Sequence, residues 1–109
     1  MKCVAHVEAG ACGFVTKVTA DSPDEQMVRL EIETDCETIA GLAGTLRGKE
    51  IDGYAEIGAG FDGVVMAATR ATLSGCCAGC VVPAGIFKAV QVAARVALPR
   101  DISVTLSKE

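Results

Sequence analysis

Alternation of apolar and polar residues in the first third of the chain predicts three β-strands. The clearest run is residues 27–34, where valine, leucine and isoleucine alternate with arginine and glutamate. A two-residue period of this kind is typical of a sheet with one buried and one solvent-facing side. Two further extended runs, at residues 3–9 and 14–20, end in the turn-forming segments 10–13 and 21–25. We therefore expect three antiparallel strands joined by short turns.

The apolar period changes after residue 34 to one residue in every three or four, which is the period of a helix with one buried face. Asp35 is the expected N-cap of the first helix. Residues 51–60 fit either a short strand or a loop with a turn, and a last alternating run at residues 102–106 predicts a C-terminal strand. Helices are predicted from about Asp35 to Gly48, from Phe61 or Asp62 to Leu73, and from Pro83 to Ala97.

These elements predict a single α+β domain that covers residues 1–109. Its expected architecture is a three-stranded antiparallel sheet followed by about three helices packed on one face, plus a C-terminal strand. A chain of 109 residues buries enough surface to fold without disulfides. No internal repeat, linker or low-complexity segment interrupts the pattern.

Composition and charge exclude several classes of protein. Half of the residues are apolar, yet no continuous apolar run reaches the roughly 18 residues that a membrane-spanning helix needs. The net charge is −4 and acidic and basic residues are interspersed, so the chain lacks the basic face that nucleic acid binding requires. The first residues pass directly into a strand pattern without the apolar region of a secretory signal. We expect a cytoplasmic protein with neither membrane nor nucleic acid as partner.

Six cysteines are the main candidates for chemistry. Three of them, Cys76, Cys77 and Cys80, fall within five residues, directly before the helix predicted from Pro83. Proline suits the first turn of a helix, and the positive end of the helix dipole favours a thiolate there. Thiolate is the form that binds metals and attacks disulfides. Because structural disulfides belong mainly to secreted proteins, metal, cluster or redox chemistry is the preferred interpretation.

Strand topology predicts that most of these cysteines meet. In antiparallel strands, the first turn, with Cys12, lies at the same end of the sheet as the exit of the third strand, before Cys36. The loop that ends at Cys80 falls at this end too if the last helix leads back to the C-terminal strand. Cys3 then lies at the opposite end and is interpreted as a small apolar core residue. The expected metal ligands are Cys12, Cys36, Cys77 and Cys80, with Cys76 as the possible alternate ligand.

Four converging thiolates fit two kinds of metal site. Tetrahedral zinc, with Zn–S bonds of ~2.3 Å, and iron–sulfur clusters both take cysteine ligands, and ligand softness does not separate them. Loops rich in glycine and alanine let backbone N–H groups approach sulfur and tune a cluster's potential, which favours iron. The alternatives are a thiol-disulfide or sulfur-handling site that uses Cys77 and Cys80, cysteines that are simply buried, and a module for protein interaction alone.

Catalysis finds little support among the polar residues. Nucleophilic and acid–base reactions need a histidine or carboxylate beside the reacting group. The only histidine, His6, is predicted in the middle of the first strand, away from the cysteines. We therefore expect a binding protein rather than an enzyme.

Several stretches resemble the IscU/NifU-type iron–sulfur cluster scaffold proteins. The resemblance rests on Ala11-Cys12-Gly13 in a strand turn, Cys36 at a helix start, the segment Gly48-Lys49-Glu50-Ile51-Asp52, and Cys-Val-Val-Pro-Ala-Gly-Ile-Phe-Lys-Ala at residues 80–89. It spans roughly residues 5–97. It implies an IscU/NifU-like fold, Cys12, Cys36 and Cys80 as ligands of a nascent cluster or zinc ion, and cluster-donor or cluster-acceptor proteins as partners.

The chain departs from this family at two positions beside the ligands. Phe14 stands where the family has an aspartate, and Gly79 stands where the residue before the last cysteine is often histidine. Neither side chain can bind a metal. Cys76 or Cys77 can supply the missing ligand, which would turn an open, transfer-competent site into a closed one. The strand expected at residues 102–106 also lies outside the family pattern. The sequence does not predict the oligomeric state.

Overall fold

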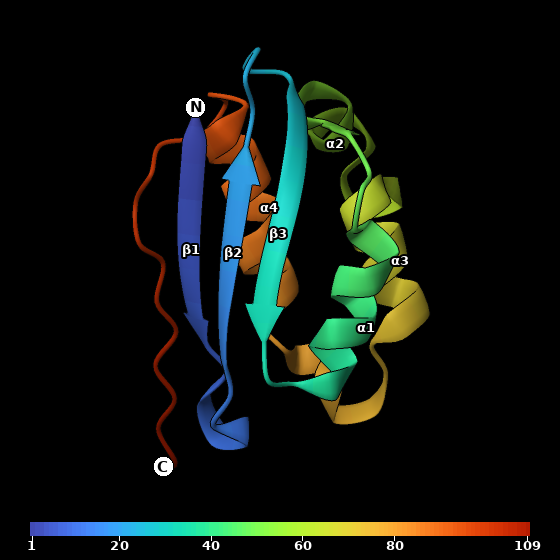
Figure 1. The fold of residues 1–109 in the computed structure, drawn as a ribbon. Helices are drawn as coiled ribbons and strands as arrows, with labels where there is room; N and C mark the ends of the chain where they lie inside the picture. Colours follow the sequence, from blue (N-terminus) through green and yellow to red (C-terminus); the bar gives the residue numbers. More distant parts are fainter.

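The computed structural model describes residues 1–109 as one antiparallel sheet with its helices on one face (Figure 1). Neighbouring strands pair in the order β1-β2-β3-β4, and every pair is antiparallel. The α+β class and the first three strands are therefore as the sequence predicts. The strands are β1 (Lys2–Glu8), β2 (Val15–Asp21), β3 (Met27–Thr34) and β4 (Ile51–Asp52).

Four helices cover one face of the sheet. They are α1 (Glu37–Leu46), α2 (Gly53–Ala59), α3 (Val64–Thr72) and α4 (Val82–Ala93), and three short 3-10 turns separate elements: η1 (Gly10–Cys12), η2 (Gly60–Asp62) and η3 (Gly75–Gly79). The long helix α4 packs on β1 and β2, whereas α1 packs on β3 and against α3. Both α1 and α4 begin at the end of the sheet where β3 ends (Figure 1).

The core lies between the sheet and the helices. Inward-facing residues of the strands, such as Val18 and Val28, share one buried cluster with Leu42 of α1 and Ile86 of α4. None of the largest fully buried side chains is aromatic, so close approach of the elements fills the interior. Gly85 shows how close this approach is, because a Cβ atom there would lie 2.7 Å from Cγ2 of Val7 in β1.

Residues 51–60, which the sequence left as a short strand or a loop, form both a strand and a helix. Residues 51 and 52 form β4, which pairs with the start of β3 and gives the sheet its fourth strand. The next residues form α2, because Oδ1 of Asp52 accepts hydrogen bonds from the N–H groups of Tyr54 (2.9 Å) and Ala55 (3.1 Å) and so caps the first turn. The glycines in this segment interrupt the apolar spacing that would predict a helix, but the helix still forms.

The last helix ends earlier than its apolar pattern indicates. The sequence predicts a helix to Ala97, but α4 ends at Ala93, and Arg95 takes a left-handed conformation with a φ of 62°. The N–H of Arg95 donates to the carbonyl of Val92 (3.0 Å), and the N–H of Val96 donates to that of Gln91 (2.9 Å). This pair of bonds is a common way to close a helix C-terminus, although glycine is the usual residue at the left-handed position.

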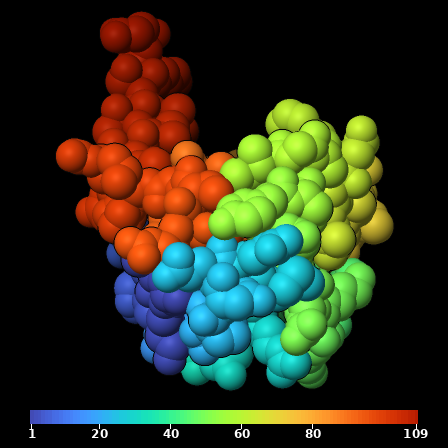
Figure 2. Space-filling model, turned by 90° about the horizontal axis from the view of Figure 1, so that it is seen from above, coloured from blue at the N-terminus to red at the C-terminus, as the bar shows by residue number.

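The predicted C-terminal strand at residues 102–106 is wrong for the isolated chain. Residues 98–109 form no helix or strand, and Figure 2 shows the C-terminal segment standing away from the rest of the molecule. The alternation of apolar and polar residues is present, but a strand also needs a hydrogen-bonding partner. The fourth strand of this sheet is therefore β4 and not the C-terminal segment.

The segment Gly75–Ala93 is long and apolar enough to cross a membrane by length and composition. In the fold it is divided between η3 and α4, and eight residues of α4 are buried in the core. Helices in the core of globular proteins can be equally long and apolar. Packing against the sheet therefore accounts for the apolar character of this segment.

Candidate functional site: a cysteine-lined pocket

Five of the six cysteines line one pocket at the end of the sheet where β3 ends. They come from three segments that are distant in sequence: the β1–β2 turn, the start of α1, and η3 with the residue that follows it. Figure 1 shows these three segments at the same end of the molecule, opposite the N-terminus. The lining cysteines are Cys12, Cys36, Cys76, Cys77 and Cys80.

The turn between β1 and β2 presents Cys12. Gly10 and Gly13 both have a φ of 75°, in the left-handed region that glycine adopts without strain. The N–H of Gly13 donates to the carbonyl of Gly10 (2.9 Å), and the N–H of Ala9 donates to that of Phe14 (3.0 Å), which closes the turn. Cys12 is exposed at the rim of the pocket, as expected for a residue in such a turn.

A pair of threonines positions Cys36 at the start of α1. The backbone N–H of Cys36 donates to Oγ1 of Thr34 (3.1 Å), and this hydroxyl lies 2.9 Å from Oγ1 of the buried Thr16. Thr16 and Thr34 are register partners on β2 and β3, and Thr16 also lines the pocket. The sequence alone does not reveal this pair, because only the register of the strands places the two hydroxyls next to each other.

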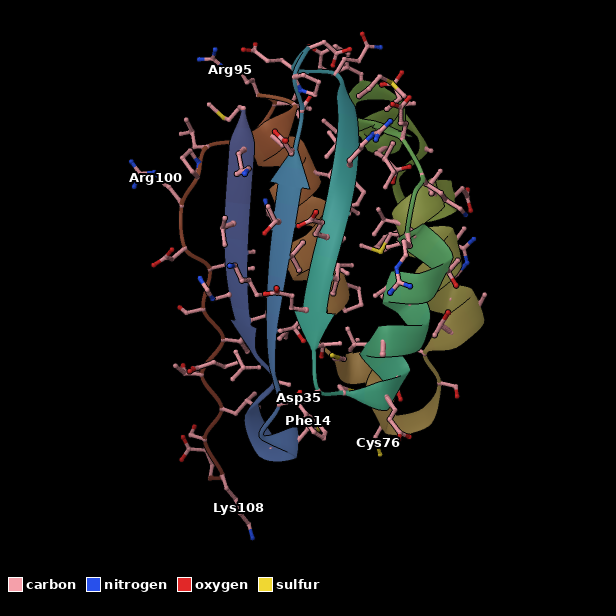
Figure 3. The ribbon with its side chains drawn as sticks, viewed as in Figure 1. Phe14, Asp35, Cys76, Arg95, Arg100 and Lys108 are labelled. Carbon is pink, nitrogen blue, oxygen red and sulfur yellow. The ribbon has the colours of Figure 1, made fainter.

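Cys36, and not Asp35, is the N-cap residue of α1, and no side chain caps the first turn. The predicted capping role of Asp35 is therefore wrong. Asp35 is exposed and is not among the pocket-lining residues, although it lies at the same end of the molecule as Phe14 and Cys76 (Figure 3).

The third segment is the single turn η3. The N–H of Cys77 donates to the carbonyl of Ser74 (3.1 Å), and the N–H of Cys80 donates to that of Cys77 (3.1 Å). Cys80 ends this turn, and α4 begins two residues later with Pro83 in its first turn. The predicted placement of Cys80 directly before a proline-started helix is confirmed.

Burial divides the lining cysteines into two groups. Cys36, Cys77 and Cys80 are half-buried and pack against the hydrophobic core. Cys12 and Cys76 are exposed, and Cys76 points outward from the end of the molecule (Figure 3). The pocket therefore has three inner thiols and two thiols at its rim.

Cys3 is separate from the pocket. It lies in β1 at the opposite end of the sheet, where it packs against the core and is half-buried. Burial raises the pKa of the Cys3 thiol, because an apolar environment disfavours the thiolate. This environment suits the expected role of Cys3 as a small apolar residue.

The electrostatic surroundings of the pocket favour anions on one side. Helices α1 and α4 both have their N-termini at the pocket. The positive end of each helix dipole stabilises negative charge near the first turn of that helix. The remaining lining is mostly apolar and includes Phe14, Ile39 and Val82. The only histidine, His6, is exposed on β1 and does not line the pocket.

The donor set of the pocket is made of thiols, which are ligands that suit a soft metal. No three cysteine, histidine, aspartate or glutamate side chains lie close enough together to hold one metal ion. Tetrahedral zinc with Zn–S bonds of ~2.3 Å places its sulfur ligands only about 3.8 Å apart. An iron–sulfur cluster holds its cysteines on separate iron atoms and so further apart. The thiols are of the kind that both groups require, and they line one pocket.

Comparison with known proteins identifies one family. A family model described as "Family of unknown function (DUF6951)" matches residues 3–106. The matched range includes all six cysteines and the C-terminal segment 102–106. No curated protein and no solved structure matches the chain.

Proposed function

This chain belongs to DUF6951, a family of unknown function, and we propose that its cysteine-lined pocket binds an iron–sulfur cluster. The proposed ligands are Cys12, Cys36, Cys77 and Cys80, with Cys76 as the alternate fourth ligand. Zinc held by the same thiols is the second form of the proposal. A bound cluster would supply electron-transfer chemistry or would be handed to another protein.

The observation that carries the proposal is the gathering of five thiols from three distant segments around one pocket. Cysteines kept only as small core residues are typically buried among apolar side chains. Here two of the five are exposed and three are half-buried, and all five line the same pocket. Ligation of a shared group explains this arrangement better than packing does.

Two further features support ligation of a cluster by these thiols. The helix N-termini at the pocket would offset part of the negative charge of a thiolate-ligated cluster. The order of Cys12, Cys36 and Cys80 along the chain is that of the IscU/NifU-type scaffolds, which this site resembles.

Anaerobic purification with serine variants tests the proposal. Wild-type protein, as isolated or after incubation with ferrous iron and sulfide, should be brown and should contain iron and acid-labile sulfide. Cys36→Ser and Cys80→Ser should each remove most of the bound iron, because a hydroxyl is a much poorer ligand for iron than a thiolate. Cys77→Ser and Cys76→Ser tell which of the two cysteines is the fourth ligand.

Cys3→Ser is the matched control, since it makes the same atomic change outside the pocket and should leave the iron content unchanged. Zinc analysis of the same samples separates the two forms of the proposal. A protein that stays colourless and holds neither iron nor zinc after reconstitution, with a normal fold by circular dichroism, would contradict both forms.

A thiol-disulfide or sulfur-handling function is the second candidate. The observation in its favour is the single turn that links Cys77 and Cys80, in which the N–H of Cys80 donates to the Cys77 carbonyl at 3.1 Å directly before α4. This spacing at a helix start is typical of redox-active cysteine pairs. In the same anaerobic samples, this function predicts a colourless, metal-free protein whose Cys77 and Cys80 oxidise reversibly to a disulfide, with no effect of Cys36→Ser.

We also propose that the protein acts by binding rather than by catalysis, in the cytoplasm, with cluster-donor or cluster-acceptor proteins as its partners. The support is chemical: the pocket contains thiols without a histidine or carboxylate in its lining. Cys12 and Cys76 at the exposed rim give a partner access to the pocket. Nucleic acid and membrane partners are not part of this proposal.

A further inference from the structure

The edge of the sheet formed by β1 has no neighbouring strand. β1 is the first strand in the order β1-β2-β3-β4, so only one of its two sides is hydrogen-bonded. Open edges of this kind readily accept a strand from another chain, and proteins usually protect them. Here a groove runs between β1 and α4, and its apolar floor includes Ala5, Val7, Ala89 and Val92.

The C-terminal segment has the properties of the strand that this edge lacks. Ile102, Val104 and Leu106 alternate with small polar residues, and their exposed fractions rise along the segment from 61% to 73% to 93%. Three large apolar side chains this exposed in five residues are unfavourable in water. The start of the segment, from Leu98 to Ile102, lines the groove beside β1. The rest then leaves the body of the molecule, as Figure 2 shows.

β1 and residues 102–106 each have one apolar and one polar face, and the two patterns are compatible. On β1, Cys3, Ala5 and Val7 are half-buried toward α4, whereas Val4 and His6 are exposed on the other face. A strand added beside β1 with Ile102 next to Cys3 would place its three apolar residues on the α4 side of the sheet. Its polar residues, Ser103 and Thr105, would then face water with the exposed residues of β1.

The charge at the start of the two segments matches in the same register. With Ile102 beside Cys3 in a parallel pair, Asp101 falls beside Lys2 on the solvent-facing side of the sheet. Opposite charges on neighbouring strands are favourable, whereas like charges are not. An antiparallel pair with Ile102 opposite Val7 would instead place Asp101 opposite Glu8. The parallel register is therefore the better one.

We propose that residues 102–106 of one molecule add as a parallel strand to the β1 edge of a second copy, and that the exchange is reciprocal and produces a two-fold symmetric dimer. In each copy, residues 98–102 line one side of the groove, and the rest of the segment projects outward. A second copy supplies both an edge for the projecting segment and a segment for the open edge. Exchange of an identical element between two protomers is a common route to dimers.

Light scattering and sedimentation under reducing conditions test this dimer, because the reductant excludes disulfide-linked species. The wild-type chain should have the mass of a dimer over a wide range of concentration. Val104→Asp should halve that mass, since it places a charge on the buried face of the added strand. The isolated fold should survive this change, because Val104 is exposed there.

Thr105→Asp is the matched control, since it adds the same charge one residue further, on the solvent-facing side of the strand, and should leave the dimer intact. Hydrogen exchange provides a second measurement. The amides of residues 102–106 should be protected in the wild type and should lose this protection in Val104→Asp. A wild type that is monomeric at every concentration, or a Val104→Asp protein that remains dimeric, would overturn the proposal. A monomer with protected amides at residues 102–106 would instead show that the segment pairs with β1 of its own chain.

Discussion

Two aspartates hold turns of this fold through their side chains. Oδ1 of Asp24 accepts hydrogen bonds from the N–H groups of Met27 (2.8 Å) and Gln26 (3.0 Å). Asp52 accepts from Ala55 and Tyr54 in the same way, and its other oxygen accepts from Nε2 of Gln26 (2.9 Å). Such donors favour the ionised carboxylate, so the Met27 N–H chiefly lowers the pKa of Asp24 and the Ala55 N–H chiefly lowers that of Asp52.

These lowered pKa values predict a loss of stability in acid. Because both carboxyls titrate at lower pH in the folded than in the unfolded chain, their contribution is complete above the unfolded value of about 3.9 and disappears as pH falls through the folded values. Urea unfolding between about pH 6 and about pH 3 should therefore show a falling midpoint. In the double variant Asp24→Asn and Asp52→Asn, this fall should be smaller.

Asp35→Asn is the control for this experiment, since Asp35 is exposed and its side chain accepts no hydrogen bond in the structure. It should follow the wild-type pH dependence. If the double variant showed the same acid loss as the wild type, the two turns would not be the source of that loss.

At the scale of elements, a buried carboxylate joins two helices. Glu56 belongs to α2, yet its oxygens accept hydrogen bonds from the N–H groups of Val64 (2.6 Å) and Val65 (3.2 Å) in the first turn of α3. Its side chain is almost completely buried. Gly63 makes room for it, because a Cβ atom at that position would lie 2.8 Å from Oε2 of Glu56. The carboxylate thus caps α3 from the neighbouring helix.

Glu56→Gln should lower the free energy of unfolding by about 2 kcal/mol, the range for a buried hydrogen bond to a charged group. The amide loses the charge and turns an N–H group toward one of the backbone N–H donors. Urea unfolding followed by circular dichroism measures the effect. Glu50→Gln is the control, because Glu50 forms an exposed ion pair with Arg29 (2.9 Å), and such pairs contribute at most about 1 kcal/mol. Equal effects of the two variants would contradict the capping role.

The sequence predicts the elements where the local pattern determines them. The three long strands and the helices α1, α3 and α4 follow from the period of their apolar residues. The helix α2 was missed, because its start depends on capping by Asp52 rather than on apolar spacing. The prediction of a C-terminal strand was wrong. Alternation of apolar and polar residues indicates which face of a strand would be buried, but it does not provide a partner strand.

The candidate site was predictable to the level of topology and no further. Antiparallel connections fix the end of the sheet at which Cys12, Cys36 and Cys80 lie, and the structure places them around one pocket there. The spacing of the thiols depends on the exact path of η1 and η3, which no sequence pattern encodes. The contact between Thr16 and Thr34 depends on strand register and was invisible for the same reason.

At the scale of the whole molecule, the pocket connects three parts of the chain that are distant in sequence. Its lining comes from the β1–β2 turn, from α1 and from the segment before α4. A group bound to thiols on all three segments would hold them together in the folded state only. Binding of this kind stabilises the fold by mass action.

Reconstitution with an iron–sulfur cluster should therefore raise the melting temperature. A ligand at 100 times its dissociation constant adds about 2.7 kcal/mol, which corresponds to a shift of roughly 10 °C or more in a domain of this size. Calorimetry of the reconstituted protein under anaerobic conditions measures the shift, and removal of the iron with a chelator should reverse it. An unchanged melting temperature in a protein with full iron content would show that the cluster lies outside the cysteine pocket.

The placement of the thiols on turns has a practical result for protein engineering. Cys12 lies in a short turn closed by two left-handed glycines, and Cys76 and Cys77 lie in another short turn, η3. Cys12 and Cys76 are the exposed members of these turns, so histidine or aspartate can replace either of them while the sheet and α4 keep their sequences. Under the proposed metal-binding function, the chain therefore offers a frame on which ligand sets for different metals can be exchanged.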